Sequence, residues 1–260
     1  SGASAQDVLA SAVVNYSHSS DSRNFIWNAD LAFSNEYDYT SIGFGGGIAK
    51  LFNDKNSEVS LKVNAYLDQW RPIYSTELHE YGLYGSNFQN NGFFSGITVL
   101  DQNGNQTSAY LPSKFKMWDS TARNSYSASV GFSQVLTKKS QVSVFFDVLR
   151  QEGMLSTPYH RIYFADKANY YIGDANAIPN YENSNNLSVY RLADDIERLP
   201  KTRFKLPIGL RWNYFISEKV VLRTYYRYYS DDWDLKAHTA SIELPIKLSD
   251  KFTLSPMYRY

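Results

Sequence analysis

The stretch NFIWNADLAFS, residues 24–34, alternates apolar and polar side chains. Successive side chains of a β-strand point to opposite faces, so one face of this segment is apolar while the other carries Asn28 and Asp30. The apolar face consists of Phe25, Trp27, Ala29, Leu31 and Phe33. This pattern predicts a β-strand that separates an apolar environment from a polar one.

The same alternation recurs along most of the chain. It is found at residues 58–68, 125–133, 141–148, 203–214, 220–228, 240–248 and 252–260, with a glycine-rich strand at 41–52 and a weaker one at 8–17. We therefore predict about ten strands. Strands this long are typical of a tilted transmembrane strand of about 9–11 residues, whereas strands of soluble sheets usually have about 5–6 residues.

Short and longer connections alternate between these strands. One side has short polar turns at residues 18–23, 53–56, 137–140, 217–219 and 249–251. The other side has residues 35–38 and 230–234 and two long connections, about 71–124 and 151–202. This layout predicts an all-β fold: a transmembrane antiparallel up-and-down β-barrel with short periplasmic turns and two long extracellular loops. We expect residues 1–260 to form this one barrel domain.

The composition supports the same class of protein. The chain has 22 tyrosines, 15 phenylalanines and 5 tryptophans, yet its mean hydropathy is only −0.44. Aromatic residues gather near the predicted strand ends, as in the girdles of outer-membrane barrels. They are Trp27 and Phe52 at one rim, and Trp70, Tyr228, Tyr229 and Trp233 at the other. A soluble sandwich or soluble ligand-binding barrel is the alternative, although its core would favour aliphatic residues.

Other classes of protein find little support in the sequence. Basic and acidic residues are equal at 26 each, so no nucleic-acid partner is expected. The lack of cysteine excludes disulfides and thiol catalysis. No apolar run is long enough for a spanning helix, and the start SGASAQDVLA lacks the features of a signal peptide.

Three segments carry a resemblance to a known family: RNFIWNADLAFSNEYDYTSIGFGGGIAKLFNDKN (23–56), LKVNAYLDQWRPIY (61–74) and RLPKTRFKLPIGLRWNYF (198–215). Together they resemble an uncharacterised family of Gram-negative outer-membrane barrels, defined only as a domain of unknown function. The resemblance implies this fold and the outer membrane of a Gram-negative bacterium, and it supplies no functional residues. It also implies that the chain is an internal piece of a longer barrel and that a small lipoprotein is a partner. The aromatic series ending at Tyr260 would instead fit a true C-terminus.

The polar face of the predicted strands has an uneven charge distribution. Its inward-facing charged residues are Asp30, Glu58, Lys62, Asp68, Asp147, Arg203, Lys205, Arg211, Arg223, Arg227, Glu243, Lys247 and Arg259. The earlier strands supply mainly acids, whereas the last four supply mainly bases, among them Arg203, with Glu243 as their single acid. In a wide barrel these walls would set up a transverse field across a water-filled lumen. In a narrow barrel the same groups would form ion pairs that plug it.

The segment SIGFGGGIAK, residues 41–50, contains four glycines. A dinucleotide-binding loop requires a third glycine where Ile48 stands, so that interpretation is weak. In a strand, Gly43, Gly45 and Gly47 would all face the lumen and leave a groove. We expect a long loop or a bulky group such as Tyr66, Trp70 or an arginine to fill it.

Several residues carry alternatives to a purely structural role. His79 and His160 lie in the long loops and suit an outer-membrane hydrolase. The acidic residues of SDDWD, 230–234, suit a calcium site less well than a solvated loop tip. The triplet 119–121 matches a short O-glycosylation pattern. No catalytic, cofactor-binding or metal-binding residue is predicted, and no enzymatic activity.

Two functions remain open. One is a channel for small polar solutes, and the other is a structural component of an outer-membrane complex. An outer-membrane hydrolase with its site in an extracellular loop, or a soluble binding protein, is the alternative. Expected partners are outer-membrane lipids and lipopolysaccharide, and another outer-membrane protein or the small lipoprotein through the Tyr- and Asn-rich loops.

Overall fold

The computed structural model describes residues 8–96, 98–100, 108, 117–157, 160–161, 189–191, 194–195 and 197–260. The chain divides into two compact units. The sheet unit comprises Ser1–Trp70, Ala122–Gly153 and Lys201–Tyr260, and the loop unit comprises Arg71–Thr121 and Met154–Pro200. That residues 1–260 form one barrel domain stays a prediction.

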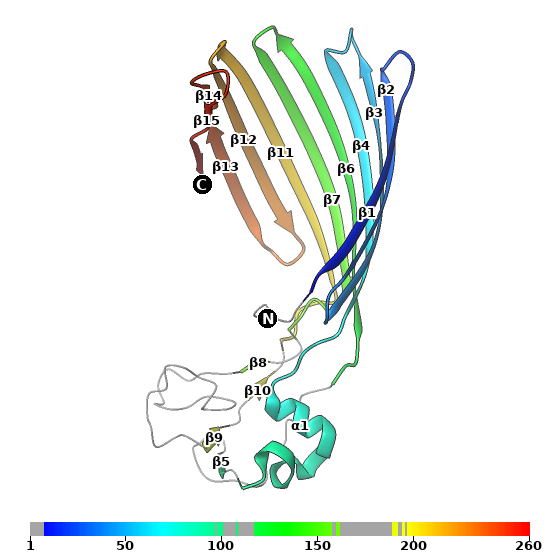
Figure 1. Cartoon of the computed structure of the whole chain (residues 1–260), viewed down its shortest axis with the longest axis vertical. Coiled ribbons are helices and arrows are strands. Elements are labelled where there is room, and N and C mark those ends of the chain that lie inside the picture. The colour runs from blue at the N-terminus through cyan, green and yellow to red at the C-terminus, as the bar shows by residue number, and fades with distance from the viewer. Residues whose placement is uncertain are drawn as a thin grey trace. The chain divides into compact units, whose positions relative to one another are not determined.

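The sheet unit is an antiparallel up-and-down sheet (Figure 1). Its path runs through β1 (Ala10–Ser19), β2 (Phe25–Asn35), β3 (Tyr39–Phe52), β4 (Ser57–Trp70), β6 (Thr121–Thr137), β7 (Ser140–Gly153), β11 (Thr202–Ser217), β12 (Val220–Asp231), β13 (Lys236–Glu243) and β16 (Met257–Arg259). The all-β class and the ten successive strands are confirmed. Strands β1 and β16 end the path, and no pairing joins them within the described part of the chain.

The alternation of short and longer connections is also confirmed, with changed boundaries. The first turn is shorter than predicted, because β1 continues through Ser19. The two long connections span 71–120 and 154–201, since β6 begins at Thr121 and β11 at Thr202.

Two prolines interrupt the strands predicted near the C-terminal end. The predicted strand 240–248 is divided at Pro245 into β13 and β14 (Ile246–Lys247), and the predicted strand 252–260 at Pro256 into β15 (Thr253–Leu254) and β16. Proline has no N–H to donate to a neighbouring strand. The backbone oxygens of Pro245 and Pro256 still accept bonds from Val221 and Leu244, which keeps the pieces in the sheet.

The sheet exposes its apolar face and partly buries its polar one. Along β2 the apolar side chains are exposed, while alternate positions such as Asn28 and Asp30 are half-buried. Leu31 is 56% exposed, and Val130 of β6 is 49% exposed. This distribution is the reverse of a soluble sheet, whose apolar face packs on a core.

The loop unit has an ordinary hydrophobic core. It contains α1 (Thr76–Tyr84), the 3₁₀ helices η1 (Gly85–Asn90) and η2 (Gly92–Phe94), and β5 (Thr98–Leu100), β8 (His160–Arg161), β9 (Val189–Arg191) and β10 (Asp194–Asp195). Leu78, Phe88 and Phe94 are fully buried, and Phe88 packs edge-to-face on Phe94 at 5.4 Å. Strands β5 and β9 pair in parallel, so the two long connections meet. None of the described helices is long and apolar enough to cross a membrane.

Candidate functional site

Strand register places the predicted inward-facing residues on one face of the sheet, here called the polar face. Asp30 lies opposite Gly45, Arg211 opposite Tyr225, and Arg223 opposite Glu243. The members of the set are Gly43, Gly45, Gly47, Asp30, Asp68, Asp147, Lys205, Arg211, Arg223, Arg227, Glu243, Lys247 and Arg259. That this face lines a lumen stays a prediction.

The glycines of β3 admit side chains from the two neighbouring strands. A Cβ at Gly43 would lie 2.8 Å from the Tyr66 ring, and one at Gly47 would lie 2.8 Å from the Asn28 side-chain oxygen. At Gly45 it would collide with the Asp30 carboxylate. Tyr66 is one of the bulky groups expected there. The groove along the glycines of β3 is therefore filled by side chains of the neighbouring strands.

The acidic side of the polar face lies on β2 to β7. The Tyr39 hydroxyl donates to Asp68 Oδ2 at 2.6 Å, while Asp68 Oδ1 is buried and makes no hydrogen bond among the described residues. Asp147 lies opposite Ser129. No ion pair is found for Asp30, Asp68 or Asp147 within the part of the chain that the structure describes.

The basic side lies on β11 to β16 and is only partly neutralised. Arg203 pairs with Asp231, Arg223 with Glu243 at 3.5 Å, and Lys247 with Asp250 at 2.7 Å. No ion pair is found, within the described ranges, for Lys205, Arg211, Arg227 and Arg259. The Nε atom of Arg227 is moreover buried without a hydrogen bond there. A net positive charge therefore remains on this side.

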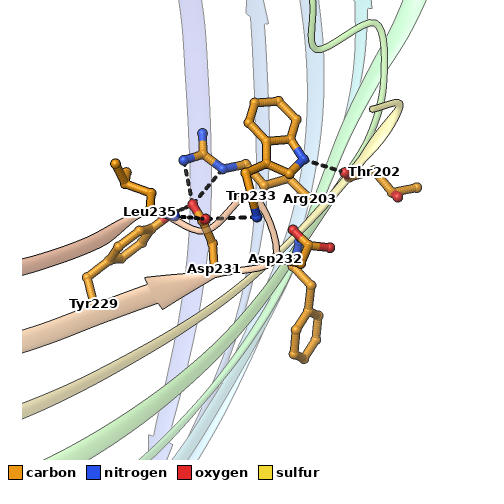
Figure 2. A network of polar contacts seen from close by, with 8 residues as sticks. Thr202, Arg203, Tyr229, Asp231, Asp232, Trp233 and Leu235 are labelled. Carbon is orange, nitrogen blue, oxygen red and sulfur yellow. Dashed lines mark hydrogen bonds and ion pairs between the residues drawn. The ribbon is translucent and has the colours of Figure 1, made fainter. Parts of the chain in front are cut away.

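Asp231 differs from two predictions, that Glu243 is the single acid on the basic side and that the acidic residues of 230–234 form a solvated loop tip, although Asp232 and Asp234 are exposed (Figure 2). Its side chain is fully buried, and its carboxylate accepts bonds from Arg203 Nε at 2.8 Å and Tyr229 Oη at 2.7 Å. The backbone N–H groups of Trp233 and Leu235 also donate to it. Asp231 is thus a second acid on the basic side, and it does not belong to a solvated loop tip.

Two of the aromatics predicted for the girdle, Tyr229 and Trp233, take part in this network. Tyr229 bonds to Asp231 from the polar face, and the Trp233 indole donates to the Thr202 carbonyl at 3.0 Å. The Arg203 guanidinium lies 4.5 Å from the Trp233 ring centroid. Their polar atoms satisfy a buried acid and a backbone carbonyl. The register places Tyr229 on the polar face, so it is not a girdle residue, whereas the girdle position of Trp233 stays a prediction.

An aromatic pair from the strands on either side of β11 contacts Arg211. Phe145 of β7 and Tyr225 of β12 stack across β11, with ring centroids 5.9 Å apart and planes 15° apart. The Phe145 ring lies above Gly209, where a Cβ would collide with it. The Arg211 guanidinium lies 5.4 Å from the Phe145 centroid and 5.6 Å from that of Tyr225. In the sequence, the signal for this contact is an aromatic residue and a glycine at inward positions of neighbouring strands.

A hollow of about 650 Å³ opens beside Arg211. Its lining is Arg211, Asn213, Arg223, Thr224, Tyr225, Ser241, Glu243, Met257 and Arg259. Three arginines and one carboxylate give it a positive balance. We call it the arginine hollow, and it is the candidate site.

The loop residues considered for hydrolysis make ordinary contacts. His79 is 58% exposed on α1, with Nδ1 3.6 Å from Glu80 Oε1. Glu80 also accepts a bond from the Phe93 backbone at 3.1 Å. The Ser156 hydroxyl donates to the Leu199 carbonyl at 3.3 Å and accepts from the Leu199 backbone N–H at 3.2 Å. The side chain of His160 lies outside the described residues, and the absence of enzymatic activity stays a prediction. In the O-glycosylation triplet, Asp119 is exposed and Ser120 half-buried.

Several solved structures match this chain at 8–11% sequence identity, with TM-scores below 0.5. CdiB from Acinetobacter baumannii matches with a TM-score of 0.42 and 10% identity, over 98% of this chain and 35% of that one. A mutant of the ferric enterobactin receptor PfeA from Pseudomonas aeruginosa matches with a TM-score of 0.47 and 8% identity, over 96% of this chain and 33% of that one. The β-domain of the Bordetella autotransporter BrkA matches with a TM-score of 0.34 and 11% identity, over 98% of this chain and 83% of that one. The chain spans about a third of CdiB and PfeA.

The family comparison covers nearly the whole chain. No curated protein matches. Residues 6–260 match a family described as protein of unknown function, DUF3570. The resemblance found in the sequence is thereby confirmed, and the chain belongs to the DUF3570 family.

Proposed function

We propose that this chain forms part of the wall of an outer-membrane β-barrel in a Gram-negative bacterium, and that its polar face borders a water-filled route for small polar solutes. The observation that carries this proposal is the reversed polarity of the sheet. Its exposed apolar residues would meet lipid and lipopolysaccharide, while unpaired charged groups face the other way. No enzymatic step is part of the proposal.

The charges on the polar face favour a water-filled route rather than an interior that is plugged by ion pairs. A plug of matched charges would require an ion-pair partner for each inward-facing charge. No such partner is found among the described residues for Lys205, Arg211, Arg227 and Arg259. Water in a lumen would solvate such groups, whereas burying them dry would cost several kcal/mol for each.

Single-channel recording in planar lipid bilayers tests this proposal. The intact protein, shown to be folded by its heat-dependent shift on a gel, is expected to give discrete current steps. Heat-unfolded protein from the same preparation serves as the control. Folded protein that inserts into the bilayer and never conducts would contradict the channel.

Exposed apolar residues of the loop unit favour a second candidate function, which is contact with another outer-membrane protein or a small lipoprotein. Leu83, Tyr84 and Phe93 are 61%, 43% and 41% exposed beside the buried aromatic core. Purification in mild detergent followed by crosslinking is expected to capture a partner, and Leu83→Ser with Phe93→Ser is expected to release it. A barrel that always purifies alone would argue against this role.

A further inference from the structure

The arginine hollow holds more positive charge than its own acid can balance. Arg223 and Glu243 approach to only 3.5 Å, with side chains 55% and 31% exposed, so this pair is a loose one. Arg211 and Arg259 have no ion pair in the described part of the chain. Two guanidinium groups of the hollow are therefore free to meet a ligand.

Arg211 is positioned in a way that suits ligand binding. The stacked Phe145 and Tyr225 rings, made possible by Gly209, attract its guanidinium through their π-systems. Such contacts leave the N–H donors at the edge of the group available. In the register, Asn213 lies opposite Arg223, so an amide adds donors and an acceptor beside the charged groups.

We propose that the arginine hollow is a binding site for small oxyanions, solutes that carry a carboxylate or phosphate group, with Arg211 as the principal contact and Arg223 and Arg259 as its supports. The planar fork of arginine donors matches both kinds of group in a bidentate way. A volume of about 650 Å³ suits a small solute. This site rests on the proposed solute route and gives that route its solute class.

Calorimetric titration of the intact protein tests the site without requiring conduction. The probes are succinate and inorganic phosphate, added at low salt in a detergent that contains no phosphate. Saturable binding is expected, and Arg211→Gln is expected to weaken it by about 10-fold or more, since hydrogen bonds to charged groups contribute more than neutral ones. Arg211→Lys should lose part of the affinity, because it keeps the charge without the fork.

Arg150→Gln is the matched control. Arg150 lies on the apolar face of β7 and is 59% exposed, with Glu152 at 3.2 Å, so this change removes the same charge outside the hollow. It is expected to leave binding unchanged. Arg259→Gln is a second test at an exposed position of β16, should Arg211→Gln disturb folding.

A lipid headgroup offers the same phosphate chemistry as a free anion. A parallel titration with phosphatidylglycerol vesicles distinguishes the two sources, because the hollow opens on the polar face. Binding of the free anions supports the site, whereas binding of the lipid alone overturns it. Absence of saturable binding, or an equal loss in Arg150→Gln, also overturns it. A protein that conducts without binding anions refutes only the site, and one that binds without conducting refutes only the channel.

Discussion

The sheet unit and the loop unit arrange their apolar side chains in opposite ways. In the loop unit, Leu78, Phe88 and Phe94 are fully buried, as in any water-soluble core. In the sheet unit, apolar residues such as Leu31 of β2 and Val130 of β6 are exposed. The polar side chains that alternate with the apolar ones along these strands are half-buried. The difference teaches that apolar groups are buried in one unit and exposed in the other, which is what the proposed lipid-facing wall requires of the sheet.

The largest expected effect comes from opening the core of the loop unit. Phe88→Ala should destabilise that unit by about 3–5 kcal/mol, since it removes a fully buried ring and leaves a cavity. Limited proteolysis should then cut within 71–120, while the sheet stays protected. Phe93→Ala, at a ring that is 41% exposed, is the control and should cost much less. Equal protease resistance in the wild type and Phe88→Ala would show that the loop unit has no such core.

Removal of the buried carboxylate of the sheet unit should have a similar effect there. Asp231→Asn is expected to cost about 3–5 kcal/mol, because the Arg203 guanidinium loses its charged partner. Urea unfolding in phospholipid vesicles, followed by tryptophan fluorescence, measures it. Asp234→Asn, at an exposed residue with φ of 61° that asparagine tolerates, is the control. Equal midpoints for the two variants would refute the buried network.

A single lysine placed on either face tests the reversed polarity directly. Val130→Lys on the apolar face should destabilise the sheet by about 2–4 kcal/mol in a bilayer, as charges on the lipid face of a barrel do. Ser129→Lys puts the same charge on the polar face opposite Asp147 and should be neutral or slightly stabilising. The same unfolding assay compares them. If Ser129→Lys were the more harmful of the two, the assignment of the faces would be wrong.

The smallest of these effects concerns a close approach on the polar face. Gly209→Ala should cost about 1–3 kcal/mol, since the new methyl group would displace the Phe145 ring from its stack with Tyr225. Near-ultraviolet circular dichroism should report the lost stacking. At Gly131 a methyl group would meet only the Ser60 hydroxyl, which can rotate, so Gly131→Ala is the milder control. An unchanged spectrum for Gly209→Ala would refute the ring contact.

Much of the fold could be predicted because its signals are local. Period-two alternation defined the strands and their faces, and polar turn residues defined the alternating connections. The same parity assigned Asp30, Gly45 and Arg223 to one face, where the register of the structure also places them. Proline is a local signal that alternation does not capture, since Pro245 and Pro256 each divide a predicted strand.

The sequence by itself thus determined the order of the strands, the face on which each side chain lies and the family. Each of these can be read from residues that are close together in the chain. Tertiary structure alone decided which charges are neutralised and where the arginine hollow lies. Asp231 reaches Arg203 from 28 residues away, and Phe145 meets Tyr225 across an intervening strand. The helix α1 and the loop core also escaped prediction. Such contacts depend on register and packing between distant segments, which residue spacing within one strand does not encode.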